Sequence, residues 1–202
     1  MAFQTKFNKE LDRLYRRRTD ELRRLLSRDK PGLPKRLTKR KRERAIRKLK
    51  EIASRCLAPK MWNRERKKYE VVRKRWPVLG WGPKQKRANF RQWLKDEVPD
   101  RHGKVYVFLR GKECRYVGRT QTSGKRPTEH FARKKFIGTT HIDVYSVRKR
   151  SATPLLECLT IHHLDPARNK IRAAKQKWCP KCPLCKAHKR IRTELRQIYG
   201  FR

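Results

Sequence analysis

Acidic residues and long apolar stretches are both scarce in this sequence. Its 202 residues include 18 Asp and Glu against 60 Lys and Arg, which gives a formal net charge of +42 at pH 7. A charge that large and one-sided repels itself in a compact chain, so it indicates a polyanionic partner, of which nucleic acid is the commonest. No stretch approaches the roughly 20 apolar residues that a membrane-spanning helix requires, so we expect no membrane partner.

Apolar residues make up only 36% of the chain, whereas 39% of its residues are charged. A chain of this length and composition has room for one ordinary domain or two small ones, with a modest core. Its amino terminus carries acids and lacks an apolar run before a small-residue cleavage site, unlike a secretory signal. We therefore expect an intracellular protein, in the cytoplasm or nucleoid, or in the nucleus or an organelle if it is eukaryotic.

The first half is predicted to be a basic, all-helical region that binds nucleic acid, residues 1–98. Leucines at helical spacing predict one helix over 8–28, and a narrow apolar stripe predicts a second over 38–59. A third basic segment follows at 62–76, then a loop rich in Pro and Gly and a short last helix. We expect this region to supply affinity through phosphate contacts, which carry no sequence information.

β-prone runs begin after residue 98. Strands are predicted at 104–109 and 114–118, and the Arg-Gly-Lys-Glu that joins them suits a hairpin. A helix over 127–136, a strand over 142–147 and a helix over 154–164 follow. This order of elements predicts an α+β fold in which helices pack on a small sheet.

Two short motifs on the predicted hairpin carry a family resemblance. Val105-Tyr106 on the first strand and Tyr116-Val117-Gly118 on the second resemble the two halves of the GIY-YIG signature of a nuclease superfamily. Further polar positions of that family follow in order, and these are Arg126, His130, Glu157 and Asn169. The match of several positions in order makes the resemblance more specific than Tyr-Val-Gly alone.

The resemblance to GIY-YIG nucleases covers residues 103–172. It implies a three-stranded antiparallel sheet flanked by helices and a metal-dependent phosphodiester hydrolysis. One departure is that Lys104 stands where the family's first glycine usually lies, although Gly103 is adjacent. Together with the basic first half, this predicts a nuclease domain over 99–172 and a Cys/His tail over 173–202.

Glu157 is the most informative residue of the set. It lies among leucines and isoleucine on an otherwise apolar predicted helix, and a carboxylate there requires a partner such as a metal. Phosphodiester hydrolysis needs a nucleophilic water and neutralisation of the charge that builds on the phosphate. One hard carboxylate suits one Mg²⁺ or Mn²⁺, with water and phosphate filling the other positions.

The resemblance implies a role for each of the other polar residues. Tyr106 would activate or orient the attacking water, with Tyr116 and His130 in the hydrogen-bond network around it. Arg126 would bind the scissile phosphate, and Asn169 would be a positioning residue. A free tyrosine titrates near pH ~10, so a basic Tyr106 needs cations to stabilise its phenolate.

Basic residues surround these motifs. Arg119 is expected to help stabilise the phenolate, together with Arg126 and the metal. The residues that we expect to contact the nucleic acid itself are Arg119, Lys125, Arg133, Lys134 and Lys135.

The tail carries four soft or borderline metal ligands at three-residue steps, namely Cys179, Cys182, Cys185 and His188. On a regular helix each such step drifts by about 60°, so four side chains could not face one ion. Pro180 and Pro183 break the helix and allow the chain to wrap around a metal. This predicts a structural zinc site that folds the tail, with an iron–sulfur cluster as its rival. The fourth ligand is open, because distant candidates are Cys56, Cys158, His162 and His163.

The leading hypothesis is therefore a metal-dependent endonuclease acting on DNA, of a restriction or mobile-element (homing) type, with RNA as an alternative substrate. From a different class comes a non-catalytic nucleic-acid-binding or ribonucleoprotein component that keeps the same fold. A zinc-finger regulator is a third reading. One active site per chain predicts that double-strand cleavage requires a homodimer or two successive nicks.

Overall fold

A computed structural model of the chain divides it into two compact units, Met1–Leu57 with Pro183–Arg202, and Ala58–Cys182. The residues that the structure describes are 9–10, 12–13, 16–17, 39–78, 83–121, 125–131, 138–167, 169, 179 and 181–198. Among these, no helix combines the length and the apolar character needed to cross a membrane.

One long helix, α2 (Lys39–Lys68), spans what we predicted as two separate segments. Pro59 lies inside this helix and not at its end. A proline removes one amide donor and crowds the preceding turn, but its fixed φ is helical, so sufficient packing can carry a helix through it. Ala58 and Trp62 beside it are buried, and the Trp62 ring meets Tyr145 edge-on with 5.1 Å between ring centroids. The predicted helix end near Pro59 is therefore wrong.

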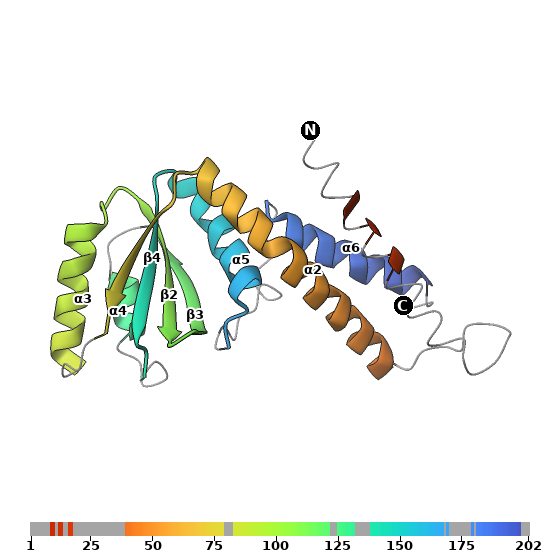
Figure 1. Cartoon of the computed structure of the whole chain (residues 1–202), viewed down its shortest axis with the longest axis horizontal. Helices are drawn as coiled ribbons and strands as arrows, with labels where there is room; N and C mark the ends of the chain where they lie inside the picture. The colour runs from red at the N-terminus through yellow and green to blue at the C-terminus, as the bar shows by residue number, and fades with distance from the viewer. Residues whose placement is uncertain are drawn as a thin grey trace, which may run out of the picture. The chain divides into compact units, whose positions relative to one another are not determined.

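The larger unit contains a four-stranded antiparallel sheet in the order β1-β4-β2-β3 (Figure 1). β2 (Gly103–Arg110) and β3 (Glu113–Thr120) form the predicted hairpin, and β4 (His141–Val147) pairs with the other side of β2. The α+β class is confirmed. The sheet has four strands and not three, because β1 (Val72–Pro77) pairs with β4. Our prediction of an all-helical first half is therefore wrong.

β1 is a strand built largely of cations, which its neighbours accommodate on both faces. Trp76 points into the core, where it is 9% exposed. On the opposite face Arg73 Nη2 and Arg75 Nε each donate to a carboxylate oxygen of Asp143, at 2.7 Å in both cases. Asp143 is itself buried on β4, so the two exposed guanidinium groups satisfy a carboxylate that the strand pairing removes from water.

The hydrophobic core lies between one face of the sheet and α3 (Pro83–Glu97), with α4 (Lys125–Phe131) beside it. Its buried members come from β1, α3, β2 and β4, and they are Trp76, Phe90, Leu94, Val98, Tyr106, Phe108, Ile142 and Val144. α5 (Thr153–Leu164) packs on the other face against β2 and β3, after the short 3₁₀ turn η2 (Arg150–Ala152) (Figure 1). Eight of the twelve residues of α5 are buried, so its side chains are held on most sides.

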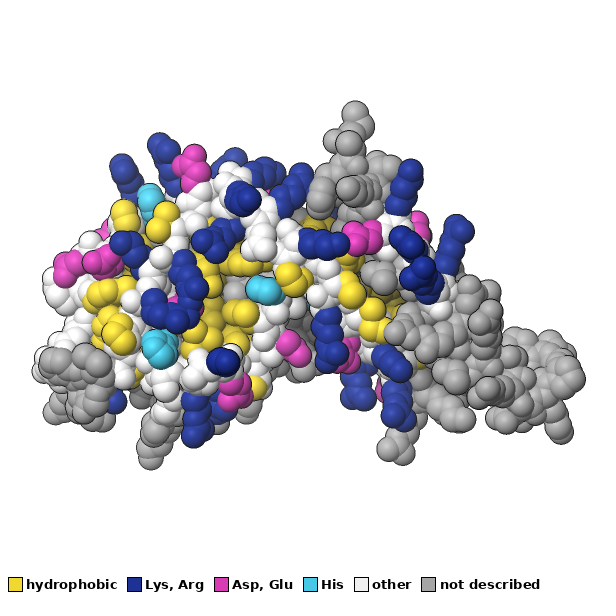
Figure 2. All heavy atoms as spheres, viewed as in Figure 1, with side chains coloured by type: hydrophobic (Ala, Val, Ile, Leu, Met, Phe, Trp, Pro, Cys, Tyr) yellow, Lys and Arg dark blue, Asp and Glu magenta, His cyan; other side chains and the backbone are white. Residues whose placement is uncertain are grey.

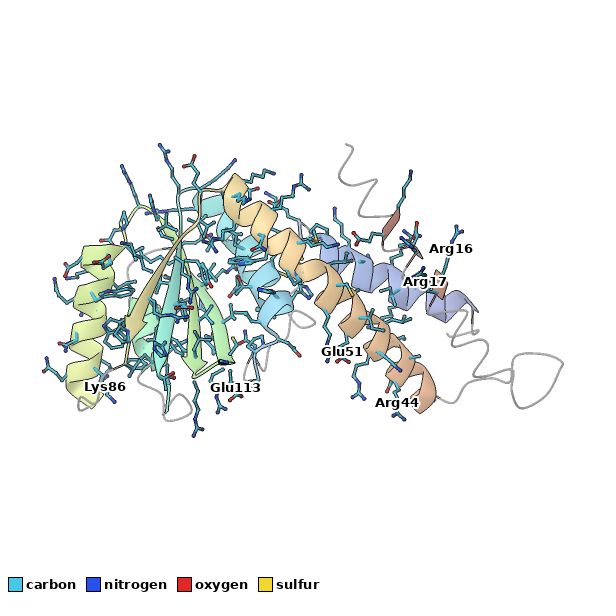
Figure 3. All side chains as sticks on the ribbon, viewed as in Figure 1. Arg16, Arg17, Arg44, Glu51, Lys86 and Glu113 are labelled. Atoms are coloured by element: carbon cyan, nitrogen blue, oxygen red, sulfur yellow. The ribbon has the colours of Figure 1, made fainter. Side chains whose placement is uncertain are left out.

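The smaller unit contains the first part of α2 and helix α6 (Pro183–Ile198). Leu184, Ala187 and Ile191 are buried at helical spacing on one side of α6, while Lys186, Lys189, Arg190 and Arg192 are exposed. The face of the molecule seen in Figure 2 carries many Lys and Arg and few acids. Figure 3 shows Arg44 and Glu51 of α2 projecting outward.

Some predictions concern parts of the chain that the structure does not describe. Most of the helix over 8–28 and most of the loop at 79–82 lie outside the described residues. The same holds for Arg133, Lys134 and Lys135 and for the side chain of Lys125.

Candidate functional site

Two tyrosines of the predicted site lie on one face of the β2–β3 hairpin. Tyr106 of β2 stands directly opposite Gly118 of β3, and Tyr116 lies two residues from Gly118 on the same side of the strand. A Cβ atom on Gly118 would lie 2.6 Å from the Tyr106 hydroxyl oxygen and 2.7 Å from Tyr116 Cε1. Glycine at this position therefore makes room for the Tyr106 ring to lie across β3.

We expect Gly118→Ala to lower the free energy of unfolding by about 1–3 kcal/mol, because the added methyl must displace the Tyr106 ring. Denaturant unfolding monitored by tyrosine and tryptophan fluorescence measures this. Gly111→Asn is a suitable control, because Gly111 has a φ of +57° that Asn tolerates and no atom lies within 4 Å of its Cβ position. Equal stability of the two variants would contradict the close contact at Gly118.

α4 brings His130 to the tyrosine pair. The Tyr106 hydroxyl lies 3.1 Å from His130 Nδ1, and the His130 ring meets Tyr116 edge-on with 5.3 Å between centroids. Arg126, four residues earlier on the same helix, is exposed. Its charge lowers the pKa of both Tyr106 and Glu157, so it lies near both side chains.

Tyr106 is a neutral phenol in this environment. Burial raises the pKa of its hydroxyl far above the ordinary value, Tyr116 and Glu157 raise it further, and Arg126 offsets only part of the rise. The loss of hydration thus outweighs the charge of Arg126, so a phenolate at Tyr106 would need a further cation, such as the predicted metal. Arg119, which we expected to assist, pairs with Glu157 instead.

Glu157 lies on the face of α5 that meets the sheet and is 7% exposed. Its Oε2 lies 3.1 Å from Arg119 Nε of β3. Burial raises the pKa of the Glu157 carboxyl, and Arg119 and Arg126 lower it in part. In this buried site only the neighbouring cations favour the charged form of the carboxylate. A bound metal would have the same effect.

Gly103 directly precedes Lys104, which occupies the position where the resemblance predicts a glycine. A Cβ on Gly103 would overlap Thr153 Oγ1, the first residue of α5. Glycine here lets the start of α5 approach β2, which positions Glu157 one turn further along the helix. Lys104 is almost fully buried, and its Nζ donates to the carbonyl oxygens of Pro99 and His102 at 3.3 and 3.5 Å.

Asn169 binds the backbone of β3. Its Oδ1 accepts from the Val117 amide at 2.9 Å and its Nδ2 donates to the Val117 carbonyl at 2.8 Å. The side chain thereby replaces a neighbouring strand at the open edge of β3, between Tyr116 and Gly118. Its contact is with the strand that carries the second tyrosine, which is how a positioning residue acts.

Asn169→Asp is expected to destabilise the larger unit by about 1–3 kcal/mol, because a carboxylate oxygen would face the Val117 carbonyl where an amide donor is needed. Thermal unfolding of the full chain measures the change. Asn89→Asp provides the control, since Asn89 contributes only the Oδ1 that accepts from Gln85 and an aspartate keeps that acceptor. A similar melting temperature for both variants would contradict the two-bond role of Asn169.

A second group of side chains, able to bind a metal ion, includes two residues of α5. Cys158 and His162 of this helix lie with Cys182, and Cys185 follows Cys182 by three residues. One ligand atom from each of Cys158, His162 and Cys182, all in the larger unit, lies within 4.8 Å of the others, and both thiols are buried. The group can hold a metal ion. All six cysteines of the chain are free of disulfides.

This group revises the predicted tail ligands. Of the predicted tail ligands in the larger unit, Cys182 belongs to the group and Cys179 does not, and Cys158 and His162 lie with Cys182. The Cys179 Sγ lies 4.0 Å from the Pro154 carbonyl oxygen, and His188 Nε2 lies 3.2 Å from Ser54 Oγ. The spacing of Cys158 and His162, four residues apart on a predicted helix, was the sequence signal for their shared face.

The structure brings Tyr106, Tyr116 and His130 into contact with one another. Arg126 and Glu157 lie close enough for their charges to shift the pKa of Tyr106. The sixth predicted catalytic residue, Asn169, binds the backbone of β3. In comparisons with known proteins, no family model, curated protein or solved structure matches this chain. Its function is therefore argued from the chemistry of the site.

Proposed function

We propose that this protein is a metal-dependent endonuclease of the GIY-YIG type that hydrolyses phosphodiester bonds in DNA. One observation carries the proposal: two tyrosines and a histidine are in contact, and an arginine and a buried carboxylate lie near enough for their charges to act on the Tyr106 hydroxyl. Taken singly, each side chain has an ordinary structural role, but a sheet core has no need to gather them around one hydroxyl. The net charge of +42 supports a polyanionic substrate.

Glu157 would hold the catalytic Mg²⁺ or Mn²⁺ through its carboxylate. When bound there, the ion supplies Lewis-acid stabilisation of the phosphate charge and a water of lowered pKa. Its donor is a hard oxygen, as such an ion requires, but Arg119 and Arg126 repel a cation. We therefore expect Glu157 to bind the ion weakly alone and more tightly once a phosphate offsets the two guanidinium charges.

Tyr106 would orient the attacking water. A neutral phenol can accept a hydrogen bond from water and, when His130 Nδ1 carries no proton, donate to that nitrogen 3.1 Å away. In that tautomer His130 would be the base of the pair, and Tyr106 would pass the proton to it. Arg126, exposed on α4 and near both Tyr106 and Glu157, would bind the scissile phosphate.

Zn²⁺ is the ion that we propose for the Cys/His group. Thiolate and imidazole ligands together are typical of structural zinc, whereas iron–sulfur clusters are held mostly by four cysteines. Free thiols are expected of a protein that works in a reducing compartment. We propose that the protein also meets nucleic acid there.

A second function, non-catalytic binding of nucleic acid, is favoured by the Arg119–Glu157 ion pair, since a carboxylate already paired needs no metal. Incubation of the full chain with supercoiled plasmid and with structured RNA, each with Mg²⁺, with Mn²⁺ and with EDTA, separates the two. Cleavage of plasmid that EDTA abolishes is the expected result. Binding of both nucleic acids without cleavage under any condition would favour the second function.

A further inference from the structure

We infer that the metal group on α5 positions Glu157, so that filling the thiolate site is a condition for full binding of the catalytic ion. The inference that the metal group positions Glu157 rests on the proposed nuclease function. The metal site itself does not.

The ligand geometry suits one tetrahedral ion. In a zinc site with Zn–S near 2.3 Å and Zn–N near 2.0 Å, ligand atoms are separated by roughly 3.5–3.8 Å. The ligand atoms of Cys158, His162 and Cys182 lie within 4.8 Å of one another, so a shift of about 1 Å closes them around an ion. Cys158 and His162 occupy positions i and i+4 of α5, which places them on one face of the helix.

The two sites on α5 select different metals. Thiolate and imidazole ligands favour Zn²⁺, whereas a lone carboxylate with water and phosphate favours Mg²⁺ or Mn²⁺. Glu157 and Cys158 are consecutive residues of one helix, with Glu157 directed to Arg119 on the sheet and Cys158 directed to Cys182. The helix therefore separates the two ions by side-chain direction.

Cys179 and Cys182 contact α5 at residues that come before and after Glu157 in the helix. Cys179 Sγ lies 4.0 Å from the Pro154 carbonyl oxygen, the Cys182 amide donates to the Cys179 carbonyl at 2.9 Å, and Cys182 lies with Cys158 and His162. A bound ion would hold these residues against the helix through strong bonds. Without it, weaker contacts alone oppose rotation or fraying of the turn that carries Glu157. Cys158, His162 and Cys182 are thus positioning residues.

Metal content of the full chain tests the ligand set. Purified protein should contain about one zinc per chain, and Co²⁺ that replaces it should show thiolate charge-transfer absorption. Cys158→Ser, His162→Gln and Cys182→Ser should each lose the zinc, while His162→Cys should keep it. Cys179→Ser, His188→Gln, His163→Gln and Cys56→Ser are matched controls that should retain it. Zinc retained by Cys158→Ser, or lost from Cys179→Ser and His188→Gln, would overturn the assignment.

Hydrogen exchange and the Mg²⁺ dependence of cleavage test the link to Glu157. In Cys158→Ser and in chain stripped by a zinc chelator, amides of Thr153–Leu164 should exchange faster. The Mg²⁺ concentration for half-maximal cleavage should rise about tenfold or more, the effect typical of losing a group that orients a metal ligand. His162→Cys should restore both values, and His163→Gln should change neither.

The outcomes separate the two proposals. If wild-type protein does not cut any substrate, the nuclease proposal fails, whereas zinc content and exchange of α5 still decide the metal site. If zinc is present and its removal leaves both α5 exchange and the Mg²⁺ dependence unchanged, the positioning role is overturned while the nuclease proposal stands.

Discussion

Glu157→Gln is expected to reduce metal-dependent cleavage by about a thousandfold or more, since loss of Lewis-acid stabilisation removes several kcal/mol from the transition state. The glutamine keeps the size of the side chain but lacks the negative charge that a hard cation requires. Nucleic-acid binding should persist or tighten slightly, because the substitution removes one of only 18 acids from a chain of charge +42. Single-turnover nicking of plasmid and a filter-binding assay measure the two effects.

Loss of activity in Glu157→Gln should not come from unfolding. Burial raises the pKa of this carboxyl above its unfolded value, so at neutral pH the ionised side chain costs the folded state free energy. The neutral glutamine removes that cost while Arg119, one third exposed, can turn to water. We therefore expect a melting temperature at or above that of wild type. Glu113→Gln, an exposed pair with Arg115, is the control that should leave cleavage and stability nearly unchanged.

Cleavage that survives Glu157→Gln would mean that another carboxylate binds the catalytic ion. Wild-type protein that binds every DNA and RNA without cutting, and a variant that binds equally well, would instead favour the non-catalytic function. Tyr106→Phe adds a further discrimination, because it removes the hydroxyl beside His130 with little change in packing.

A chain that starts at residue 99 is expected not to fold. It would lack β1, α3 and the residue after α3, which contribute Trp76, Phe90, Leu94 and Val98 to the core of the larger unit. At about 1.5–3 kcal/mol for each buried side chain, the loss is roughly 6–12 kcal/mol, comparable with the whole stability of a domain of about 5–15 kcal/mol. Asp143 would also lose the guanidinium groups of its two arginine partners.

A chain that starts at residue 58 is the matched comparison, because it keeps the larger unit Ala58–Cys182 whole. Circular dichroism and limited proteolysis should show a cooperative, protected fold for 58–202 and none for 99–202. A cooperative transition in 99–202 equal to that of 58–202 would mean that β1 and α3 are dispensable. The contribution of the basic amino-terminal segment to DNA binding is best measured by comparing 58–202 with the full chain.

The sequence predicted the hairpin, β4 and α5 to within a few residues, because their patterns and turn chemistry agree. Gly111 supplies the left-handed turn residue between two β-prone runs, with a φ of +57°. β1 escaped prediction because its alternating residues are mostly Arg and Lys, which indicate a solvated surface. The tertiary partner Asp143, distant in sequence, makes pairing of that strand with β4 favourable.

The candidate site was predicted residue by residue, but the interactions within it were not. Spacing alone cannot tell that Arg119 pairs with Glu157, or that burial keeps Tyr106 neutral. Likewise, the regular steps from Cys179 to His188 indicated four adjacent ligands. The fold instead brings α5 to Cys182, so two ligands, Cys158 and His162, come from a helix that ends well before the tail.

The edges of the sheet constrain how two copies of this chain can associate. At β3 the side chain of Asn169 already occupies the donor and acceptor of Val117, so a foreign strand would have to displace it before it could extend the sheet. If β1 of one copy paired with β1 of another, Arg73, Lys74 and Arg75 of the two copies would face one another. Like charges repel one another across a strand pair. Both edges thus resist open-ended strand addition and the aggregation that follows from it. A dimer that cuts both strands of a duplex would have to form through helices or through the nucleic acid itself.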